Sequence, residues 1–167
     1  MKWTKSELLE MKDDIRFEED IELDPEIFRN NPLITDTEDI HVEGRGHYDE
    51  AGDQLYLNLH VDGVMICPDA ITYEDIEIPF ETDSEEIYSF EKTEEDGVRI
   101  VNGEAVDTLE AVIDAILLEV PIQVTLVEEG QYPEGDGWKV YSEAEYQESR
   151  KDQIDPRLAK LKQFKSE

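Results

Sequence analysis

The most regular hydrophobic pattern in the chain runs from residue 107 to residue 121. Asp107 stands where a helix N-cap is expected, Glu110 follows three residues later as in a capping box, and Pro121 disfavours helical geometry at the preceding residue. The apolar residues between them recur at the spacing of one helix face: Leu109, Val112, Ile113, Ile116, Leu117 and Val120. We therefore expect a buried amphipathic helix around which the fold is organised.

Alternation of apolar and polar residues predicts β-strands on either side of this helix. The clearest alternation covers residues 55–61 and continues towards residue 66, and weaker alternation covers residues 15–23 and 40–48. Further strands are predicted over residues 71–80, with a bulge near residues 74–75 where the alternation changes parity, and over residues 122–126. The short loops between the early segments indicate antiparallel hairpins.

A short helix is predicted at the N-terminus, where Thr4 and Glu7 form the pattern of a capping box. Together the elements predict the α+β class. We expect an antiparallel, curled β-sheet or partial barrel packed on one buried amphipathic helix, with this short N-terminal helix and a basic C-terminal helical tail.

The chain is strongly acidic, with 45 Asp and Glu against 15 Lys and Arg among 167 residues and a formal charge of −30. Three interpretations are open: a solvated surface that favours solubility or suits a salty cytoplasm, a surface that attracts a basic partner such as a ribosomal protein, or mimicry of nucleic acid. Direct binding of nucleic acid by the main body is disfavoured, because phosphate contacts need Lys and Arg.

The charge reverses near the C-terminus and predicts two parts, an acidic domain over residues 1–149 and a basic tail over residues 150–167. The tail holds six basic and three acidic residues, whereas the domain holds nine basic and 42 acidic residues. Asp155 is a good N-cap and Pro156 a good first helical residue. This helix either docks on its own acidic domain or contacts a partner. We expect it to bind a partner through Asp155, Pro156, Arg157, Leu158, Lys160, Leu161 and Lys162.

The chain offers little for catalysis or metal binding. His41 and His60 fall opposite the apolar residues of their strands and should be exposed, and the three histidines, with His47, lack the tight spacing of a metal site. Cys67 is the single cysteine, so no internal disulfide is expected, and it is best interpreted as a small buried hydrophobe. We expect no catalytic residues, no metal, no cofactor and no small-molecule substrate.

The sequence has no apolar run long enough to span a membrane, and its N-terminus lacks the apolar core of a signal peptide. We therefore expect a cytoplasmic protein that does not contact membranes.

Several stretches, in this order and spacing, resemble the YceD-like family of large ribosomal RNA subunit accumulation proteins. They are Trp3 to Leu9, Val42 to Gly46, the segment from Cys67 to Phe80, the helix from Leu109 to Pro121, and Asp155 to Leu161. The last stretch is the most specific. Gly137-Trp138-Lys139-Val140 is similar to the version found in Bacillus-type members.

The resemblance implies a role in accumulation of the large-subunit ribosomal RNA, and hence in ribosome assembly. Genes of this family often neighbour one for a small basic large-subunit ribosomal protein, which makes such a protein, or the pre-50S particle, the expected partner. Many relatives carry Cys-x-x-Cys where this chain has Cys67-Pro68-Asp69-Ala70, and further cysteines where it has residues 128–137. A zinc or redox role at those positions is therefore not expected here.

The leading hypothesis is a non-enzymatic assembly factor that supports accumulation of 23S rRNA. Its acidic domain would hold a basic ribosomal protein, and its basic tail would contact precursor 23S rRNA or the assembling particle. The alternative is an acidic mimic that sequesters a nucleic-acid-binding protein. A hydrolase using carboxylates or a metal is a third hypothesis, for which no motif was found.

Overall fold

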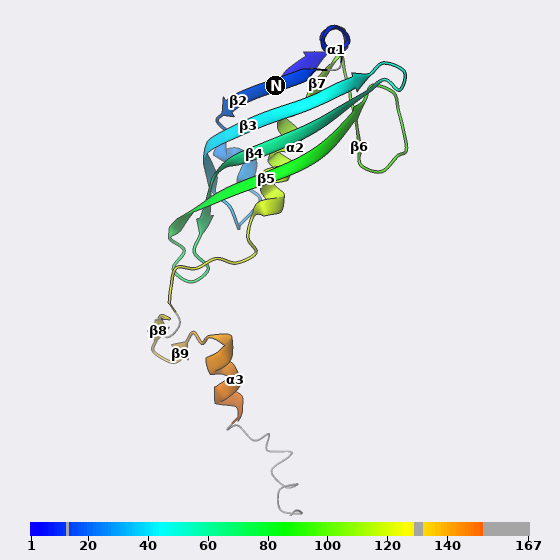
Figure 1. Cartoon of the computed structure of the whole chain (residues 1–167). Helices are drawn as coiled ribbons and strands as arrows, with labels where there is room; N and C mark the ends of the chain where they lie inside the picture. The colour runs from blue at the N-terminus through cyan, green and yellow to red at the C-terminus, as the bar shows by residue number, and fades with distance from the viewer. Residues whose placement is uncertain (13, 129–131, 152–167) are drawn as a thin grey trace, which may run out of the picture. The chain divides into compact units, whose positions relative to one another are not determined.

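The computed structural model describes residues 1–12, 14–128 and 132–151 (Figure 1). The chain separates into two units, Met1–Val124 and Thr125–Glu167. The first unit contains the strands β1 to β7 and the helices α1 and α2, and the second contains β8, β9 and α3. The predicted boundary between residues 149 and 150 stays a prediction.

An open five-stranded sheet forms the centre of the first unit, with the strand order β2-β3-β4-β5-β6 (Figure 1). The strands are β2 (Ile15–Ile21), β3 (Asp36–Asp49), β4 (Gln54–Pro68), β5 (Asp75–Ser89) and β6 (Val98–Ile100). Successive strands from β2 to β5 pair antiparallel, as the short loops predict, whereas β6 pairs parallel with β5. A mostly antiparallel sheet with few helices fits the predicted α+β class. The sheet does not close, since β2 and β6 lie at its edges.

The helix α2 (Leu109–Glu119) confirms the organising helix of the sequence and packs on β4 and β5. Its buried residues are Ala111, Val112, Ala115 and Ile116, and they join the inner sheet residues Leu55, Leu57, Leu59 and Val61 in one core. The predicted N-cap is wrong by one residue, because Thr108 occupies the cap position. Asp107 still serves the helix end, since its carboxylate accepts the N–H of Leu109 at 3.1 Å.

The N-terminal segment closes one end of the core. The predicted capping box is confirmed, with Thr4 and Glu7 bonding reciprocally at the start of α1 (Lys5–Met11). Before it, β1 (Lys2–Thr4) pairs antiparallel with β7 (Ala105–Asp107), immediately before α2. Leu8 is fully buried, and the Trp3 ring lies 4.9 Å from the Phe17 ring, centroid to centroid.

Two predicted strand segments do not form strands. Residues 69–74 make a turn, in which the Asp69 carboxylate accepts the N–H groups of Ile71 and Thr72 at 2.7 and 3.0 Å. This side chain satisfies the backbone locally, so β5 begins only at Asp75 and no bulge is needed near that point. Residues 122–126 are not in strand conformation, and the Val124 carbonyl accepts a hydrogen bond from the Ala70 N–H at 2.8 Å.

In the second unit, β8 (Glu134–Gly135) and β9 (Trp138–Lys139) form a small hairpin before α3 (Glu143–Lys151). Reciprocal hydrogen bonds of 3.1 Å between Ser142 and Glu145 cap the start of α3. The predicted docking helix over residues 155–162 lies outside the described residues.

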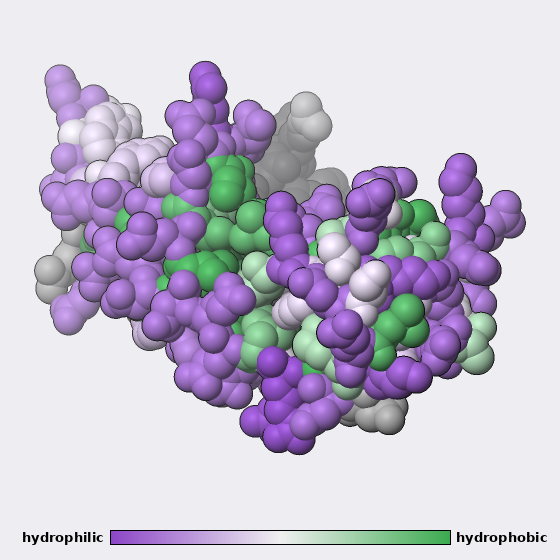
Figure 2. All heavy atoms as spheres, turned by 90° about the horizontal axis from the view of Figure 1, so that it is seen from above, coloured by the Kyte–Doolittle hydropathy of each residue, from purple (hydrophilic) through white to green (hydrophobic). Residues whose placement is uncertain are grey.

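Hydrophilic residues cover most of the surface seen in Figure 2, and apolar side chains reach it in small groups between them. This distribution fits the excess of carboxylates in the sequence. No helix in the described part of the chain is long and apolar enough to cross a membrane.

Candidate functional site on the outer sheet face

The sheet has an inner face against α2 and an outer face that carries charged side chains. Because side chains alternate along each strand, the residues between the core positions all point outward. We call the following residues the acidic face: Glu18 and Asp20 of β2, His41, Glu43 and Arg45 of β3, His60 and Asp62 of β4, and Glu81, Asp83 and Glu85 of β5. It holds seven carboxylates and one guanidinium.

The strand register arranges the acidic face in rows across the sheet. One row runs through Asp20, His41, Asp62 and Glu81, which are successive cross-strand partners. The next row runs through Glu18, Glu43, His60 and Asp83. Each histidine therefore has carboxylates beside it on both neighbouring strands.

A β-bulge in β3 lies immediately before His41 and brings Glu38 to the same face. The register of β3 against β4 shifts between Glu38 and His41, and Asp39 within the bulge has a positive φ of 52°. The extra residue reverses the parity of the strand, so Glu38 and His41 point to the same side while Ile40 is buried. His41 itself follows the alternation of residues 40–48, with Ile40 and Val42 buried on either side of it, so the bulge decides the face of Glu38.

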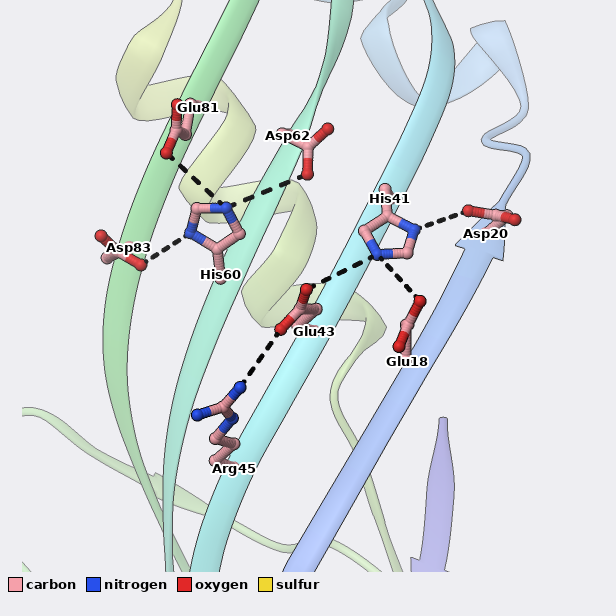
Figure 3. A network of polar contacts seen from close by, with 9 residues as sticks. All are labelled: Glu18, Asp20, His41, Glu43, Arg45, His60, Asp62, Glu81 and Asp83. Carbon is pink, nitrogen blue, oxygen red and sulfur yellow. Dashed lines mark hydrogen bonds and ion pairs between the residues drawn. The ribbon is translucent and has the colours of Figure 1, made fainter.

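His41 is held by carboxylates from two strands (Figure 3). Its Nδ1 lies 2.6 Å from Asp20 Oδ1, and its Nε2 lies 3.7 Å from Glu18 Oε1 and 4.0 Å from Glu43 Oε1. The hydrogen bond to Asp20, aided by the charges of Asp20, Asp62 and Glu18, raises the pKa of His41 above its ordinary value.

His60 has a matching environment between β4 and β5 (Figure 3). Its Nδ1 lies 2.8 Å from Asp83 Oδ1, and its Nε2 lies 3.8 Å from Glu81 Oε1 and 4.0 Å from Asp62 Oδ1. The hydrogen bond to Asp83, with the charges of Asp83, Glu81 and Asp62, raises the pKa of His60. Both histidines therefore bind a proton more readily than free imidazole does.

A pocket opens on the acidic face next to His60. The residues that line it include Glu43, Arg45, Asn58, Asp83 and Glu85. Arg45 lies 3.7 Å from Glu43, so part of the negative charge here is already compensated within the chain. The remaining carboxylates face solvent, where they attract cationic groups.

The exposed carboxylates of the acidic face are placed to attract positively charged side chains. Among the described residues, no group of three or more His, Cys, Asp or Glu side chains is placed to hold a metal ion. Cys67 is buried on the inner face, and burial raises the pKa of its thiol, which makes it a poor nucleophile. Its interpretation as a small core residue is confirmed.

The sequence predictions for the histidines are partly confirmed. His41 and His60 do point away from the core, although neighbouring carboxylates cover part of each ring. His47 stacks on Tyr56 with ring centroids 5.0 Å apart. Sequence reasoning missed the two carboxylate clusters, because these residues come together only through the strand register. The residues predicted to bind a partner, 155–158 and 160–162, are outside the described part of the chain.

Two comparisons place the chain among known proteins. The profile of the family described as large ribosomal RNA subunit accumulation protein YceD matches residues 57–165. A Bacillus subtilis (strain 168) protein, the uncharacterized protein YlbN, is 36% identical over 172 residues, covering 98% of this chain and 96% of that protein. No solved structure matches the chain. The matched residues include β5, α2 and most of β4, and the similarity to YlbN spans nearly the whole fold, so the chain belongs to the YceD family of large ribosomal RNA subunit accumulation proteins.

Proposed function

We propose that this protein is a non-enzymatic ribosome-assembly factor that supports accumulation of 23S rRNA in the cytoplasm. The observation that carries this proposal is the match to the YceD family over residues 57–165, whose description names large ribosomal RNA subunit accumulation. Its direct partner is a basic large-subunit ribosomal protein or the pre-50S particle that contains one.

The charge of the molecule supports a partner of this kind. A protein with a formal charge of −30 repels free RNA and attracts cationic proteins. Ribosomal proteins that bind rRNA need many Lys and Arg side chains for phosphate contacts. An acidic protein that holds such a partner before it reaches the rRNA screens its positive charge, and the association is fast and salt-sensitive.

The basic tail supplies a second contact in this proposal. Residues 150–167 hold six basic residues against three acidic ones, unlike the rest of the chain. Asp155, Pro156, Arg157, Leu158, Lys160, Leu161 and Lys162 would dock on the particle or on precursor 23S rRNA. Six basic residues alone would give only weak RNA binding. In this proposal the tail therefore acts together with the acidic domain.

The acidic face gives some support to the alternative function, a nucleic-acid mimic. A mimic must present carboxylates at the spacing of phosphates, and the rows of the acidic face do present carboxylates on every strand from β2 to β5. The two rows are interrupted by His41 and His60, and Arg45 lies beside them, whereas a phosphate backbone carries continuous negative charge. We therefore favour the assembly factor.

A tagged full-length protein isolated from growing cells tests the proposed partners. We expect large-subunit ribosomal proteins, or precursor 23S rRNA, to be recovered at low salt and to decrease as the salt concentration rises, because exposed charges are screened within roughly 8–10 Å at physiological ionic strength. A preparation that contains neither at low salt contradicts the proposal. Competition by free nucleic acid for a non-ribosomal partner would instead favour the mimic.

A further inference from the structure

The outer face of the sheet indicates how the basic partner binds. We propose that the acidic face holds an extended Lys- and Arg-rich segment of a protein partner, with two basic side chains, two positions apart in that segment, seated in the carboxylate clusters around His41 and His60. This inference rests on the proposed function for the partner's identity, and on the geometry of the sheet for the binding mode.

The carboxylates of the two clusters are accessible to a partner. The side chains of Asp20 and Asp83, which bond the two imidazoles, are 91% and 85% exposed, and Glu18 and Glu81 are also exposed. The opposite face of the same strands is buried by α2 and the core. Of the two faces of the sheet in the described part of the chain, the outer one is therefore the accessible one.

Each cluster is centred on one imidazole, which carries a positive charge only when it is protonated. Three carboxylates lie within 4.0 Å of each ring, namely Glu18, Asp20 and Glu43 around His41, and Asp62, Glu81 and Asp83 around His60. A single imidazole can balance at most one of three negative charges. An ammonium or guanidinium group placed beside the ring would find two further carboxylates, and guanidinium can bond carboxylates in a bidentate manner.

The spacing of the two clusters selects an extended segment. His41 is paired with Asp62 and His60 with Glu43, so the two histidines are diagonal neighbours on adjacent strands. Diagonal neighbours in an antiparallel sheet lie roughly 7–8 Å apart. Alternate side chains of an extended chain lie on one side, about 6.6–6.8 Å apart. Basic residues at every second position of the partner therefore match both clusters at once.

Protons compete with the partner for the same carboxylates. His41 is faced by Glu18 and Asp20 of β2, Glu43 of its own strand and Asp62 of β4. His60 is faced by Asp62 of its own strand and by Glu81 and Asp83 of β5, with Glu43 of β3 as its cross-strand partner. Protonation of either imidazole neutralises part of its cluster, so binding of a basic segment weakens as the pH falls through the raised pKa values of the two histidines.

Titration of the full-length protein with a short peptide in which Arg alternates with Thr tests the binding mode. We expect the Asp20→Asn/Asp83→Asn variant to bind this peptide about tenfold more weakly, because each exposed ion pair contributes modestly and two are lost. The matched control is Glu94→Gln/Glu95→Gln, which removes the same two charges from an exposed loop and should change the affinity less than twofold. Equal effects of the two variants would show attraction by net charge alone and overturn the inference.

Two further readouts separate the acidic face from other sites. Binding should weaken between pH 8 and pH 6 in the wild-type protein and much less in the His41→Gln/His60→Gln variant. The same pH dependence in both proteins would contradict the role of the clusters.

In NMR spectra, the peptide should shift the imidazole resonances of both histidines. If dilution, or replacement of Lys160 and Lys162 by Gln, shifts them without peptide, the occupant is a second copy or the chain's own tail.

The outcomes distinguish this inference from the proposed function. If the Asp20→Asn/Asp83→Asn protein recovers ribosomal partners from cells as well as the wild type does, the acidic face is not the binding site. The assembly role would then remain intact. If the wild-type protein binds the peptide tightly and with the expected pH dependence but recovers no ribosomal partner from cells, the acidic face is a binding site for basic segments. The assembly role would then be rejected.

Discussion

The Ile116→Asp variant fails to fold the Met1–Val124 unit, whereas Leu118→Asp folds like the wild type. Ile116 is 0% exposed, in the middle of α2 where the helix meets β4 and β5, and Leu118 on the same helix is 85% exposed. Truncating a buried aliphatic side chain alone costs about 2–5 kcal/mol, and an unpaired carboxylate in its place adds a desolvation penalty. The total approaches the roughly 5–15 kcal/mol by which whole proteins are stable.

Urea unfolding followed by circular dichroism measures this difference. The two variants introduce the same charge two residues apart in one helix, so helix propensity and net charge are matched and burial is the remaining difference. A cooperative transition of normal midpoint for Ile116→Asp would mean that α2 is not the element on which the sheet depends.

Replacement of Arg99 by Met should destabilise the Met1–Val124 unit by about 2 kcal/mol. The reason is that the partly buried carboxylate of Glu86 loses the charged group to which it is hydrogen-bonded. Arg99 of β6 donates to Glu86 of β5 at 2.7 Å and to Asp114 of α2 at 2.7 Å, so one side chain joins two strands and the helix. The Glu86 side chain is only 13% exposed and would remain as a partly desolvated, unpaired carboxylate.

Arg45→Met is the matched control for Arg99→Met. Arg45 is 74% exposed and lies 3.7 Å from Glu43, so its loss should change the unfolding free energy by less than about 1 kcal/mol. Adding Glu86→Gln to Arg99→Met should recover part of the stability, since the unpaired charge is then removed. If both arginine variants lower the urea midpoint equally, the junction of β5, β6 and α2 does not depend on this ion pair.

The parts of the fold predicted correctly are those set by local sequence. The apolar spacing from Leu109 to Val120 predicted α2, and the alternation around Leu55 to Val61 predicted β4 and its inner face. The Thr4 and Glu7 side chains satisfy backbone groups of their own helix end, so that cap could be read without tertiary information. The packing departs from the pattern at Leu109, which is exposed, whereas Ala111 and Ala115 join the buried face of α2.

The wrong or missing predictions involve residues whose state is decided by distant partners. Residues 122–126 alternate like a strand but are not in strand conformation. The parallel pairing of β6 with β5 has no signal in the local sequence pattern. The bulge at Asp39 carries no glycine to mark it, so its effect on the parity of β3 was not foreseen. Register, unlike periodicity, depends on which segments pair.

The same distinction explains the candidate site. That His41 and His60 point outward could be predicted from alternation along each strand. Their carboxylate clusters draw Glu18 and Asp20 from β2, and Glu81 and Asp83 from β5, up to 23 residues away in sequence from the histidine that they bond. In a chain with 45 acidic residues, sequence alone gives no reason to select these four.

The ratio of 23S to 16S rRNA in cells depleted of this protein tests the central claim most directly. If the protein supports accumulation of large-subunit rRNA, as its family membership and acidic surface lead us to propose, the ratio falls on depletion. It should recover when the wild-type chain is supplied, but not when the Ile116→Asp chain is. A ratio that stays constant on depletion, with growth and ribosome content unchanged, would contradict the account.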